Sequence, residues 1–356
     1  MASTMNNYAL FPGCSAETTG RAYTESFNYI AERIGLNVAE IDDWNCCGSA
    51  VASGVDPDLA DALPARSLAL AEEQFGDTPV LALCAGCYQS LRRGLVHARR
   101  SEGDHARIER LIDRSYSARA EVVNGIEVFL DQEVADAVTS QVVAPLEGMK
   151  VACYYGCMLL RPRDLCSFDD EESPTTMEKV VALSGATPIE WAFKTECCGA
   201  SHQVSMAKQT KPLIGRIFDD AVSNGAEAIA CACPLCMLNL DMREDEVNRQ
   251  RKAAGLPEID IPVYYFTELI ASSMGALPDE SGVARHFHPA SELVVKAMER
   301  GVDATIERLD KPALSPEEAA FEVKLAAMDP EKAAKVRAAH EAKKRKQEQK
   351  GKEVIA

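Results

Sequence analysis

The sequence predicts an α/β protein built from two duplicated Rossmann-like units in a pseudo-twofold arrangement, followed by a C-terminal tail that is helical or flexible. Three observations lead to this prediction. A pattern of cysteines occurs twice along the 356 residues. Short apolar runs alternate with helical segments in both halves. The last part of the chain is rich in charged residues and has few apolar ones.

The cysteine pattern is the clearest sign of duplication. Each half contains a single cysteine after a glycine, then a vicinal pair in Cys-Cys-Gly, then a CxxC motif. The cysteines of the first copy are Cys14, Cys46, Cys47, Cys84 and Cys87, and those of the second are Cys157, Cys197, Cys198, Cys233 and Cys236. Because both sets keep the same order and similar spacing, we interpret them as one unit used twice.

Each unit is expected to begin with a buried strand, at residues 8–13 and 151–156, because both are short apolar runs that end at glycine. Residues 16–35 then show helical spacing of apolar side chains and end in glycine. The further predicted strands are 37–41, 79–84, 187–191 and 228–233, and the further predicted helices are 57–74 and 211–225. Each CxxC therefore follows a strand, at the sheet edge where open α/β sheets bind ligands.

Domain limits follow from this pattern. We predict a first unit at 1–145, in which 100–145 is a helical insertion or connector, and a second unit at 146–284. A charged tail, helical or disordered, occupies 285–356. Within it, residues 315–356 are rich in Ala, Glu and Lys and have one aromatic residue, Phe321. Such a segment forms either a solvated helix with a frayed end or a docking arm for a partner.

Composition limits the class of function. The formal net charge of −17 argues against general nucleic-acid binding. The N-terminus lacks a basic segment followed by an apolar stretch, and no apolar run is long enough to span a membrane, so we expect a cytoplasmic protein. Thiols stay reduced there, and clustered cysteines more often bind metal or carry out redox chemistry than form disulfides.

Five cysteines with a vicinal pair favour a multi-iron group. A tetrahedral zinc site takes four ligands, usually from two CxxC-type loops. Neighbouring side chains in an extended loop point in different directions, so a vicinal pair can ligate two metals of an extended cluster. Thiolates are the preferred ligands of iron–sulfur clusters. Zinc in one of the two sites stays open as a minor alternative.

These motifs resemble the cysteine-rich CCG domains of the B-type subunit of heterodisulfide reductase. The match covers roughly residues 8–273 and includes the stretches YYGC, LLRP, ECCGASH and CPLC. The resemblance implies two noncubane [4Fe–4S] clusters, one on each set of five cysteines, with a disulfide substrate held between them. It also implies a ferredoxin-like subunit of the C type and a flavin-containing subunit of the A type as electron-supplying partners.

Three cysteines remain outside the two sets. Cys153 and Cys231 are expected on buried strands, where cysteine behaves as a small hydrophobic residue, and Cys166 has no assigned role. Cys153 is the only rival to Cys157 as the first ligand of the second set. The parallel between FPGC at 11–14 and YYGC at 154–157 favours Cys157.

Two further residues are candidates for catalysis. His202, four residues after Cys198, is the nearest imidazole to a cluster loop in sequence, and it either donates a proton to a released thiol or donates a hydrogen bond that tunes the cluster. Arg161 either meets an anionic thiol substrate or forms a structural salt bridge.

The leading functional prediction is an enzyme, the catalytic subunit of a complex that interconverts a disulfide and two thiols. The alternative is an electron-relay subunit, not itself catalytic, of a quinone- or flavin-linked oxidoreductase. A structural zinc scaffold is a third interpretation. The chain has no GxGxxG motif after a strand and no Walker-type loop, so bound flavin, nicotinamide or ATP is not indicated, and electrons must arrive from a partner.

Overall fold

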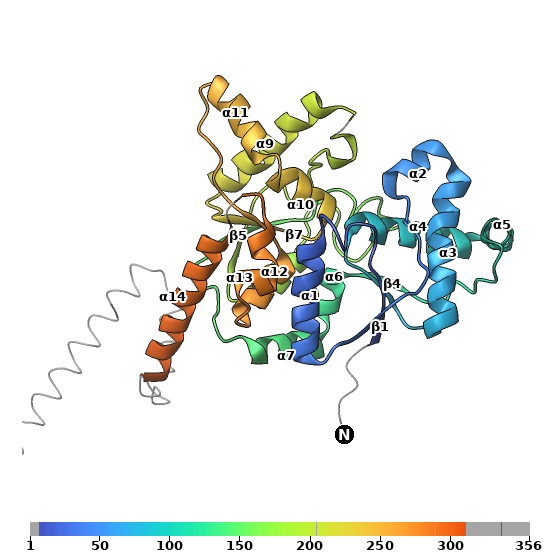
Figure 1. Cartoon of the computed structure of the whole chain (residues 1–356), viewed down its shortest axis with the longest axis horizontal. Coiled ribbons are helices and arrows are strands. Elements are labelled where there is room, and N and C mark those ends of the chain that lie inside the picture. The colour runs from blue at the N-terminus through green and yellow to red at the C-terminus, as the bar shows by residue number, and fades with distance from the viewer. Residues whose placement is uncertain (1–6, 204, 289, 311–335, 337–356) are drawn as a thin grey trace, which may run out of the picture. The chain divides into compact units, whose positions relative to one another are not determined.

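Two four-stranded parallel sheets with the same strand order form the framework of the protein (Figure 1). The first sheet has the order β2-β1-β3-β4 and the second β6-β5-β7-β8, and each pair of neighbouring strands is parallel. The strands are β1 (Asn7–Phe11), β2 (Asn37–Glu40), β3 (Val80–Ala82), β4 (Val122–Asn124), β5 (Lys150–Tyr154), β6 (Thr187–Ile189), β7 (Ala228–Cys231) and β8 (Val263–Tyr265). The predicted duplicated α/β architecture is thereby confirmed.

The computed structural model describes residues 7–203, 205–288, 290–310 and 336. By contacts, the chain divides into a compact unit at Met1–Asp303 and a second at Ala304–Ala356. Both sheets belong to the first unit, whose fold is described below. The predicted segment 315–356 lies, except for residue 336, outside the described residues.

Helices connect the strands in both halves. In the first half they are α1 (Arg21–Ile34), α2 (Ser49–Val55), α3 (Pro57–Phe75), α4 (Ala85–Arg100), α5 (Glu102–Ile112), α6 (Gly125–Leu130) and α7 (Gln132–Gln141). In the second half they are α8 (Thr176–Ala182), the short 3₁₀ helix η1 (Ala200–His202), α9 (Ala207–Ser223), α10 (Pro234–Asp241), α11 (Glu244–Ala253), α12 (Phe266–Ser273), α13 (Pro278–Ser281), the 3₁₀ helix η2 (Val283–Arg285) and α14 (Ser291–Asp310).

Local sequence signals account for these elements. The central strands are buried along almost their whole length, as expected for parallel strands covered on both faces. Helix α1 ends at Gly35, whose left-handed backbone, with φ of 71°, favours glycine. Helix α3 begins after Asp56, whose side chain accepts a hydrogen bond from the backbone N–H of Asp58, with Pro57 in its first turn.

The segment 100–145 contains more than the predicted helical connector. Residues Val122–Asn124 form β4, which pairs with β3 and completes the first sheet. Its counterpart β8 plays the same part in the second sheet. Both strands have only three residues, too few to give a periodic signal in the sequence.

The two halves pack on each other through two equivalent pairs of helices. Helix α1, which follows β1, packs on α12, which follows β8, and α6, which follows β4, packs on α8, which follows β5. Ser26 and Thr267 share a buried hydrogen bond of 2.7 Å between α1 and α12. Each contact thus pairs the helix after the first strand of one half with the helix after the last strand of the other, as expected of a pseudo-twofold relation.

The compact unit continues past the predicted end of the second half at residue 284. Within α14, Val294 and Ala297 are fully buried, and Tyr264 donates a hydrogen bond to the carbonyl of Ala290. The compact unit therefore extends to Asp303, because the first turns of α14 place an apolar stripe against the second half.

Candidate functional site

All ten paired-motif cysteines lie in the segments that follow the carboxyl ends of strands. Cys14 and Cys157 follow β1 and β5, the vicinal pairs follow β2 and β6, and the CxxC motifs follow β3 and β7. Parallel strands present their carboxyl ends at the same edge of a sheet, so each set of five gathers at one edge.

Each set of five cysteines lines one cavity. The first set lines a cavity of about 500 Å³, and the second set lines a much smaller one of about 20 Å³. The second cysteine of each vicinal pair and both CxxC cysteines are buried, whereas Cys14, Cys46 and Cys197 are exposed. The two sets therefore share one pattern, with an outer and an inner group of thiols.

The thiols approach one another in pairs. The sulfur atoms of Cys47 and Cys87 are 3.4 Å apart, and the equivalent Cys198 and Cys236 sulfurs are 3.6 Å apart. Cys157 and Cys197 are separated by 3.7 Å. Two thiolates on one tetrahedral metal, each at a bond length of about 2.3 Å, lie about 3.8 Å from each other. These pairs are therefore spaced as two ligands of one metal ion.

The described thiols do not form a site for a single ion. Among the described residues, no three Cys, His, Asp or Glu side chains are placed to hold one metal ion together. Because each set offers five thiols and a tetrahedral zinc site takes four ligands, the donor set fits a group with several irons better than one zinc ion, and the all-thiolate chemistry suits an iron–sulfur cluster.

Glycines keep the backbone close to the inner thiols. A Cβ on Gly13 would lie 2.8 Å from the Cys87 sulfur, and one on Gly156 would lie 3.0 Å from the Cys236 sulfur. Both glycines have a positive φ, 73° and 66°, and both directly precede the first cysteine of their set. Glycine at this place leaves room for a sulfur atom in both halves, which further supports a cluster cradle.

The glycine after each vicinal pair has a geometric reason as well. Gly48 and Gly199 adopt left-handed backbone conformations and begin α2 and η1. A Cβ on Gly199 would lie 2.7 Å from Thr210, and the Gly199 N–H donates a hydrogen bond of 3.3 Å to the Cys197 sulfur. The turn therefore holds an outer thiol in place by a backbone contact.

Hydrogen bonds among the thiols favour thiolates in both sets. The pKa of Cys47 is lowered to about 3 by hydrogen bonds from Cys46 and Cys87. The pKa of Cys197 is lowered to about 6, first by the Cys157 thiol and further by the backbone of Gly199 and the charge of His202. Thiolate is the form that binds metal, so each set includes at least one cysteine prepared for ligation.

The two sets meet at a seam between the halves. Cys84 and Cys233, each the first cysteine of a CxxC, interact through their thiols, which raises the pKa of Cys84 and contributes to lowering that of Cys233. Ala200, Ser201 and Leu235 of the second half line both cavities. Ala85, next to Cys84, lines the cavity of the second set. The two candidate cluster sites are thus neighbours.

The remaining three cysteines lie apart from the cavities. Cys153 and Cys231 are fully buried on β5 and β7, and burial raises the pKa of both. Cys166 is buried, and its thiol donates to the carbonyl of Met158. None of the three is among the described residues that line either cysteine cavity. Cys157, in contrast, lines the cavity of the second set, as its choice over Cys153 requires.

The two candidate catalytic side chains occupy different surroundings. The Arg161 guanidinium donates to the hydroxyl of Thr195 at 3.0 Å and to the carbonyl of Glu171, and it pairs with Glu172 at 3.2 Å. These contacts fix the loop before the second vicinal pair and match the structural interpretation of Arg161. His202 is exposed in η1, next to Ser201 of the shared cavity wall.

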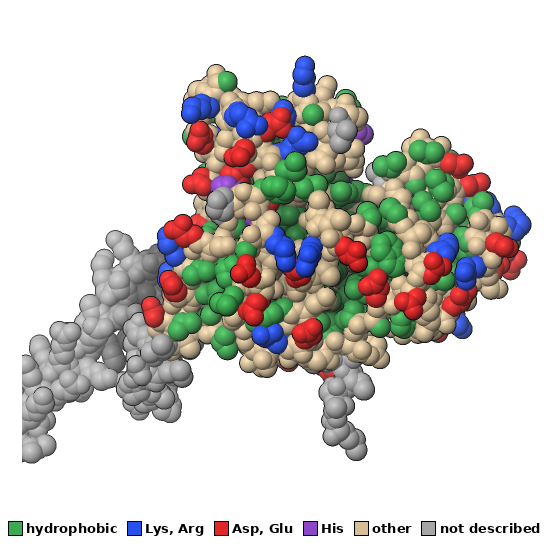
Figure 2. Space-filling model, in the orientation of Figure 1, with side chains coloured by type: hydrophobic (Ala, Val, Ile, Leu, Met, Phe, Trp, Pro, Cys, Tyr) green, Lys and Arg blue, Asp and Glu red, His purple; other side chains and the backbone are tan. Residues whose placement is uncertain are grey.

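Several residues around the cysteines give no signal in the sequence. Helices α2 and α3 supply an apolar wall to the larger cavity through Val51, Val55, Leu59 and Leu63, and the first three are exposed. Figure 2 shows hydrophobic side chains gathered on the surface over these helices. Tyr23, Tyr154 and Tyr265 are buried, and their pKa values are raised first by burial and then by the charges of cysteine thiols. From the sequence alone, such residues cannot be distinguished from ordinary core residues, because their place near the cysteines depends on how the two halves pack.

Among the described residues, no helix is both long enough and apolar enough to cross a bilayer.

Comparison with known proteins identifies the duplicated motif. The model of the cysteine-rich CCG domain matches residues 8–92 and again residues 151–241. A solved structure of a hypothetical protein from Helicobacter pylori shares the fold, with a TM-score of 0.60 at 10% sequence identity. The alignment covers 80% of this chain and 52% of that one, so the chain spans about half the length of that protein.

Curated relatives are subunits of reductases. The chain is 29% identical over 289 residues to the 8-methylmenaquinol:fumarate reductase membrane anchor subunit of Wolinella succinogenes, covering 80% of this chain and 98% of the relative. It is 25% identical over 301 residues to the B-type subunit of the ferredoxin:CoB-CoM heterodisulfide reductase of Methanosarcina mazei, covering 83% and 98%. The B-type subunit of the ferredoxin/F(420)H(2)-dependent enzyme of Methanosarcina acetivorans matches to the same extent. With two CCG domains and full-length similarity to these subunits, the chain belongs to the family of cysteine-rich CCG-domain proteins that includes the B-type subunit of heterodisulfide reductase.

Proposed function

We propose that this chain is the catalytic iron–sulfur subunit of a heterodisulfide-reductase-like complex, and that it interconverts a disulfide and two thiols. The observation that carries the proposal is that Ala200, Ser201 and Leu235 line both cysteine cavities, which makes the two five-cysteine sets neighbours at one seam. Two noncubane [4Fe–4S] clusters would be held there, one on each set.

The reaction requires two electrons and two protons for each disulfide. An iron–sulfur cluster, when bound, supplies one electron at a time. Two adjacent sets of ligands therefore suit a single S–S bond better than one set alone. The direction of the reaction depends on the potentials of the partners.

The chain's own residues bind and shield the reacting disulfide. Ala200, Ser201 and Leu235 line both cavities, so they form the common wall against which such a disulfide would lie. None of the described residues that line the two cavities carries a charged side chain apart from the cysteine thiolates. This lining favours uncharged groups next to the inner sulfur atoms.

Protons must come from the rim of the site. His202 follows Ser201 and is exposed, so it can exchange protons with solvent and lies beside the cavity wall. The proposal assigns it the part of proton donor. Arg161 acts here through the loop of Thr195, which carries Cys197 and Cys198, rather than on the substrate.

Partners of a cytoplasmic complex complete the proposal. A ferredoxin-like subunit of the C type and a flavin-containing subunit of the A type would deliver electrons to the chain, whose sequence has no nucleotide-binding loop of its own. The relatives are each named as subunits of multi-component reductases, which supports a function within a complex.

A second candidate function is electron relay without disulfide chemistry. It is favoured by the similarity to the membrane anchor subunit of a methylmenaquinol:fumarate reductase, which extends over 98% of that protein. In this case the two cluster sites would pass electrons between a quinone-linked partner and a dehydrogenase subunit.

One experiment separates the two candidates. Anaerobically purified protein is expected to contain about eight irons for each chain, counting two four-iron clusters. Addition of candidate disulfides to the reduced protein should then produce a substrate-dependent paramagnetic signal together with thiol release. Iron without any disulfide response would support the relay function, and zinc without iron would exclude both.

A further inference from the structure

A pocket of about 290 Å³ lies between the two halves, and no cysteine is among the described residues that line it. The first half contributes the loop before α1, with Thr18 and Thr19. The second half contributes α10 and the end of β8, and the segment 285–287 completes the wall. The volume is close to the lower limit of about 300 Å³ for small-molecule sites, so the pocket can hold one small ligand.

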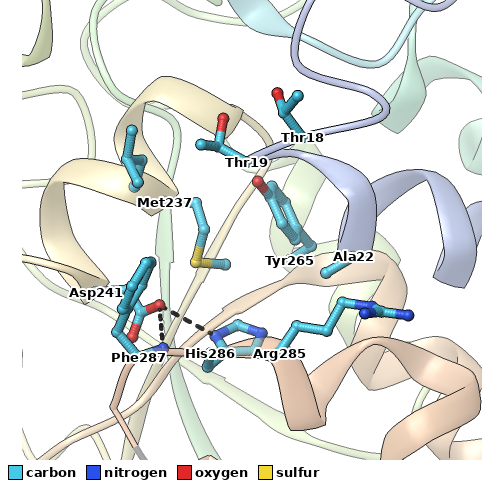
Figure 3. A pocket seen from close by; sticks show the side chains of 10 residues that line it. Thr18, Thr19, Ala22, Met237, Asp241, Tyr265, Arg285, His286 and Phe287 are labelled. Carbon is cyan, nitrogen blue, oxygen red and sulfur yellow. Dashed lines mark hydrogen bonds and ion pairs between the residues drawn. The ribbon is translucent and has the colours of Figure 1, made fainter.

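Polar groups occupy the two ends of this pocket. Figure 3 shows the Tyr265 hydroxyl directed toward Thr19 at one end and the imidazole of His286 at the other. The Met237 side chain lies between them, and Leu238 adds to the apolar lining. The pocket therefore suits a ligand with an apolar body and polar atoms at its opposite ends.

Two buried polar atoms of the lining residues lack a hydrogen-bond partner among the described residues. They are the hydroxyl oxygen of Tyr265, which is 1% exposed, and Nδ1 of His286, whose side chain is 3% exposed. Nδ1 lies 3.8 Å from Oδ2 of Asp241, too far for a hydrogen bond. Because an unpaired buried polar group destabilises the protein, a ligand that pairs with both atoms would be stabilised by them.

Both unpaired groups are hydrogen-bond donors. Nε2 of His286 lies 2.8 and 3.0 Å from the two carboxylate oxygens of Glu268 and donates to them. Burial alone would lower the pKa of His286, but the charge and hydrogen bond of Glu268 and the charge of Asp241 outweigh burial and raise it, so Nδ1 also carries a proton. Burial raises the pKa of Tyr265 well above its ordinary value, so the phenol keeps its proton. The ligand should therefore offer two acceptor atoms.

The charged side chains around the pocket already have partners. The Arg285 guanidinium donates to both carboxylate oxygens of Glu25, at 2.6 and 2.9 Å. The Asp241 carboxylate accepts the two backbone N–H groups of residues 287–288, each at 2.9 Å. An ionic ligand would find no unpaired countercharge among the described lining residues, so the pocket favours an uncharged ligand.

The pocket adjoins segments that carry cysteines of both sets. Met237 directly follows Cys236 in α10, and the Thr18 hydroxyl donates to the carbonyl of Cys14 at 3.4 Å. A small redox carrier bound in the pocket would therefore lie next to a segment from each candidate cluster site.

We propose that this pocket is a binding site for a quinone, with the Tyr265 hydroxyl and the Nδ1–H of His286 as donors to its two carbonyl oxygens. A quinone is an uncharged, flat and largely apolar ring with carbonyl oxygens at opposite ends, which matches the apolar middle and the polar ends of the pocket. The inference goes beyond the proposed function, since neither candidate function gives this pocket a ligand.

The test is equilibrium dialysis of the oxidised, iron-loaded full-length chain with a naphthoquinone methylated at both free carbons of the quinone ring. This compound cannot alkylate thiols, which matters in a chain with 13 cysteines. Dimethylnaphthalene, the same ring system without oxygen atoms, is the matched ligand. We expect one quinone to bind to each chain.

Tyr265→Phe removes one donor and keeps the aromatic ring. It should weaken quinone binding about fivefold, or about 1 kcal/mol, and leave hydrocarbon binding unchanged, because only the quinone has an oxygen that pairs with the hydroxyl. Tyr116→Phe is the control. The Tyr116 hydroxyl is also buried without a partner among the described residues, but Tyr116 does not line this pocket, so its loss should affect neither ligand.

Thr19→Phe is a second variant that leaves the core untouched, since Thr19 is exposed. The added ring should fill one end of the pocket and weaken quinone binding at least about tenfold at unchanged iron content. Thr139→Phe is its control, at an exposed position of α7 that is not among the lining residues, and it should bind the quinone as the wild type does.

Three results would overturn the proposal. These are failure of the wild-type chain to bind the quinone, a Tyr265→Phe variant whose loss of affinity is absent or equal for both ligands, and quinone binding that Thr19→Phe leaves unchanged, which would put the ligand elsewhere in the chain. If Tyr265→Phe does not retain its iron, Thr19→Phe decides the question. Because no turnover is measured, failure of this test and failure of the proposed disulfide chemistry are distinguishable.

Discussion

The sulfur atoms of Cys198 and Cys236 lie 3.6 Å apart, although 38 residues separate the two cysteines in sequence. Cys47 and Cys87 repeat the relationship in the first half at 3.4 Å. In both cases a glycine before the first cysteine of the set approaches the CxxC sulfur so closely that a side chain would collide with it. This shared geometry leads to a direct test of the two cluster sites.

Gly13→Ala and Gly156→Ala should each reduce the iron content by about one cluster of the pair. The added Cβ would lie 2.8 Å from the Cys87 sulfur in the first variant and 3.0 Å from the Cys236 sulfur in the second. Gly35→Ala is the control, since Gly35 has a similar positive φ of 71° but no atom within 4 Å of the added carbon. Iron analysis of the three proteins distinguishes collision from backbone strain, and equal iron in all three would contradict the prediction.

Cys157→Ser should lose the iron of the second set, whereas Cys153→Ser should largely keep it. The Cys157 thiol is 3.7 Å from Cys197 and lines the cavity of the second set. Cys153 is fully buried on β5 and is not among the described residues that line either cysteine cavity. Iron content and the visible absorption spectrum check the difference. The reverse pattern would move the ligand assignment to Cys153.

Loss of either cluster should abolish disulfide turnover rather than halve it. Cys47→Ser removes an inner thiol of the first set and Cys198→Ser its equivalent in the second. If one disulfide reacts at the seam formed by Cys84 and Cys233, both sets are needed in every turnover. Steady-state thiol release by each variant is the measurement. About half the activity in each variant would indicate two independent sites.

Asp61→Asn should lower the free energy of unfolding by about 2–3 kcal/mol at neutral pH, because it breaks a buried ion-pair cluster. The Asp61 side chain is 5% exposed and accepts from Arg93 at 2.9 Å, Arg107 at 2.6 Å and His97 at 2.9 Å. Asp58→Asn is the control, since Asp58 shares Arg107 but is largely exposed and should cost less than about 1 kcal/mol. Denaturant unfolding of both variants checks the prediction.

The Asp61 carboxylate also makes the free energy of unfolding depend on pH in the acidic range. Burial alone would raise the pKa of Asp61, but hydrogen bonds from Arg107 and Arg93 outweigh it and hold the pKa below the ordinary 3.8. A lowered pKa stabilises the folded state above the unfolded value, and this contribution is lost as the pH falls through the folded value. The difference between wild type and Asp61→Asn should therefore be constant from neutral pH down to about pH 5 and shrink below about pH 4. A difference in stability that stays constant across this pH range would show that the ionised Asp61 carboxylate is not the source of the stabilisation.

Much of the fold could be predicted because its signals are local. The strands β1, β5, β3 and β7 are buried on both sides and appear as apolar runs, and the helices behind them show helical spacing with glycine or proline at their ends. The strands β4 and β8 could not be predicted, because three residues carry no period and their pairing depends on β3 and β7. The packing of α14 could not be predicted for a similar reason, since its buried stripe has meaning only against its neighbours.

The sequence by itself determined which residues could be ligands and at which sheet edge they lie, because the cysteines follow their strands at short distances along the chain. Only the tertiary structure decided which thiols pair, such as Cys198 with Cys236, and that Cys84 meets Cys233. It also decided that Tyr23 of the first half stacks on Tyr265 of the second and that Arg161 is bound to the loop of Thr195. These relationships arise from the packing of one half on the other, and contacts between residues far apart in the chain leave no period or spacing in the sequence to reveal them.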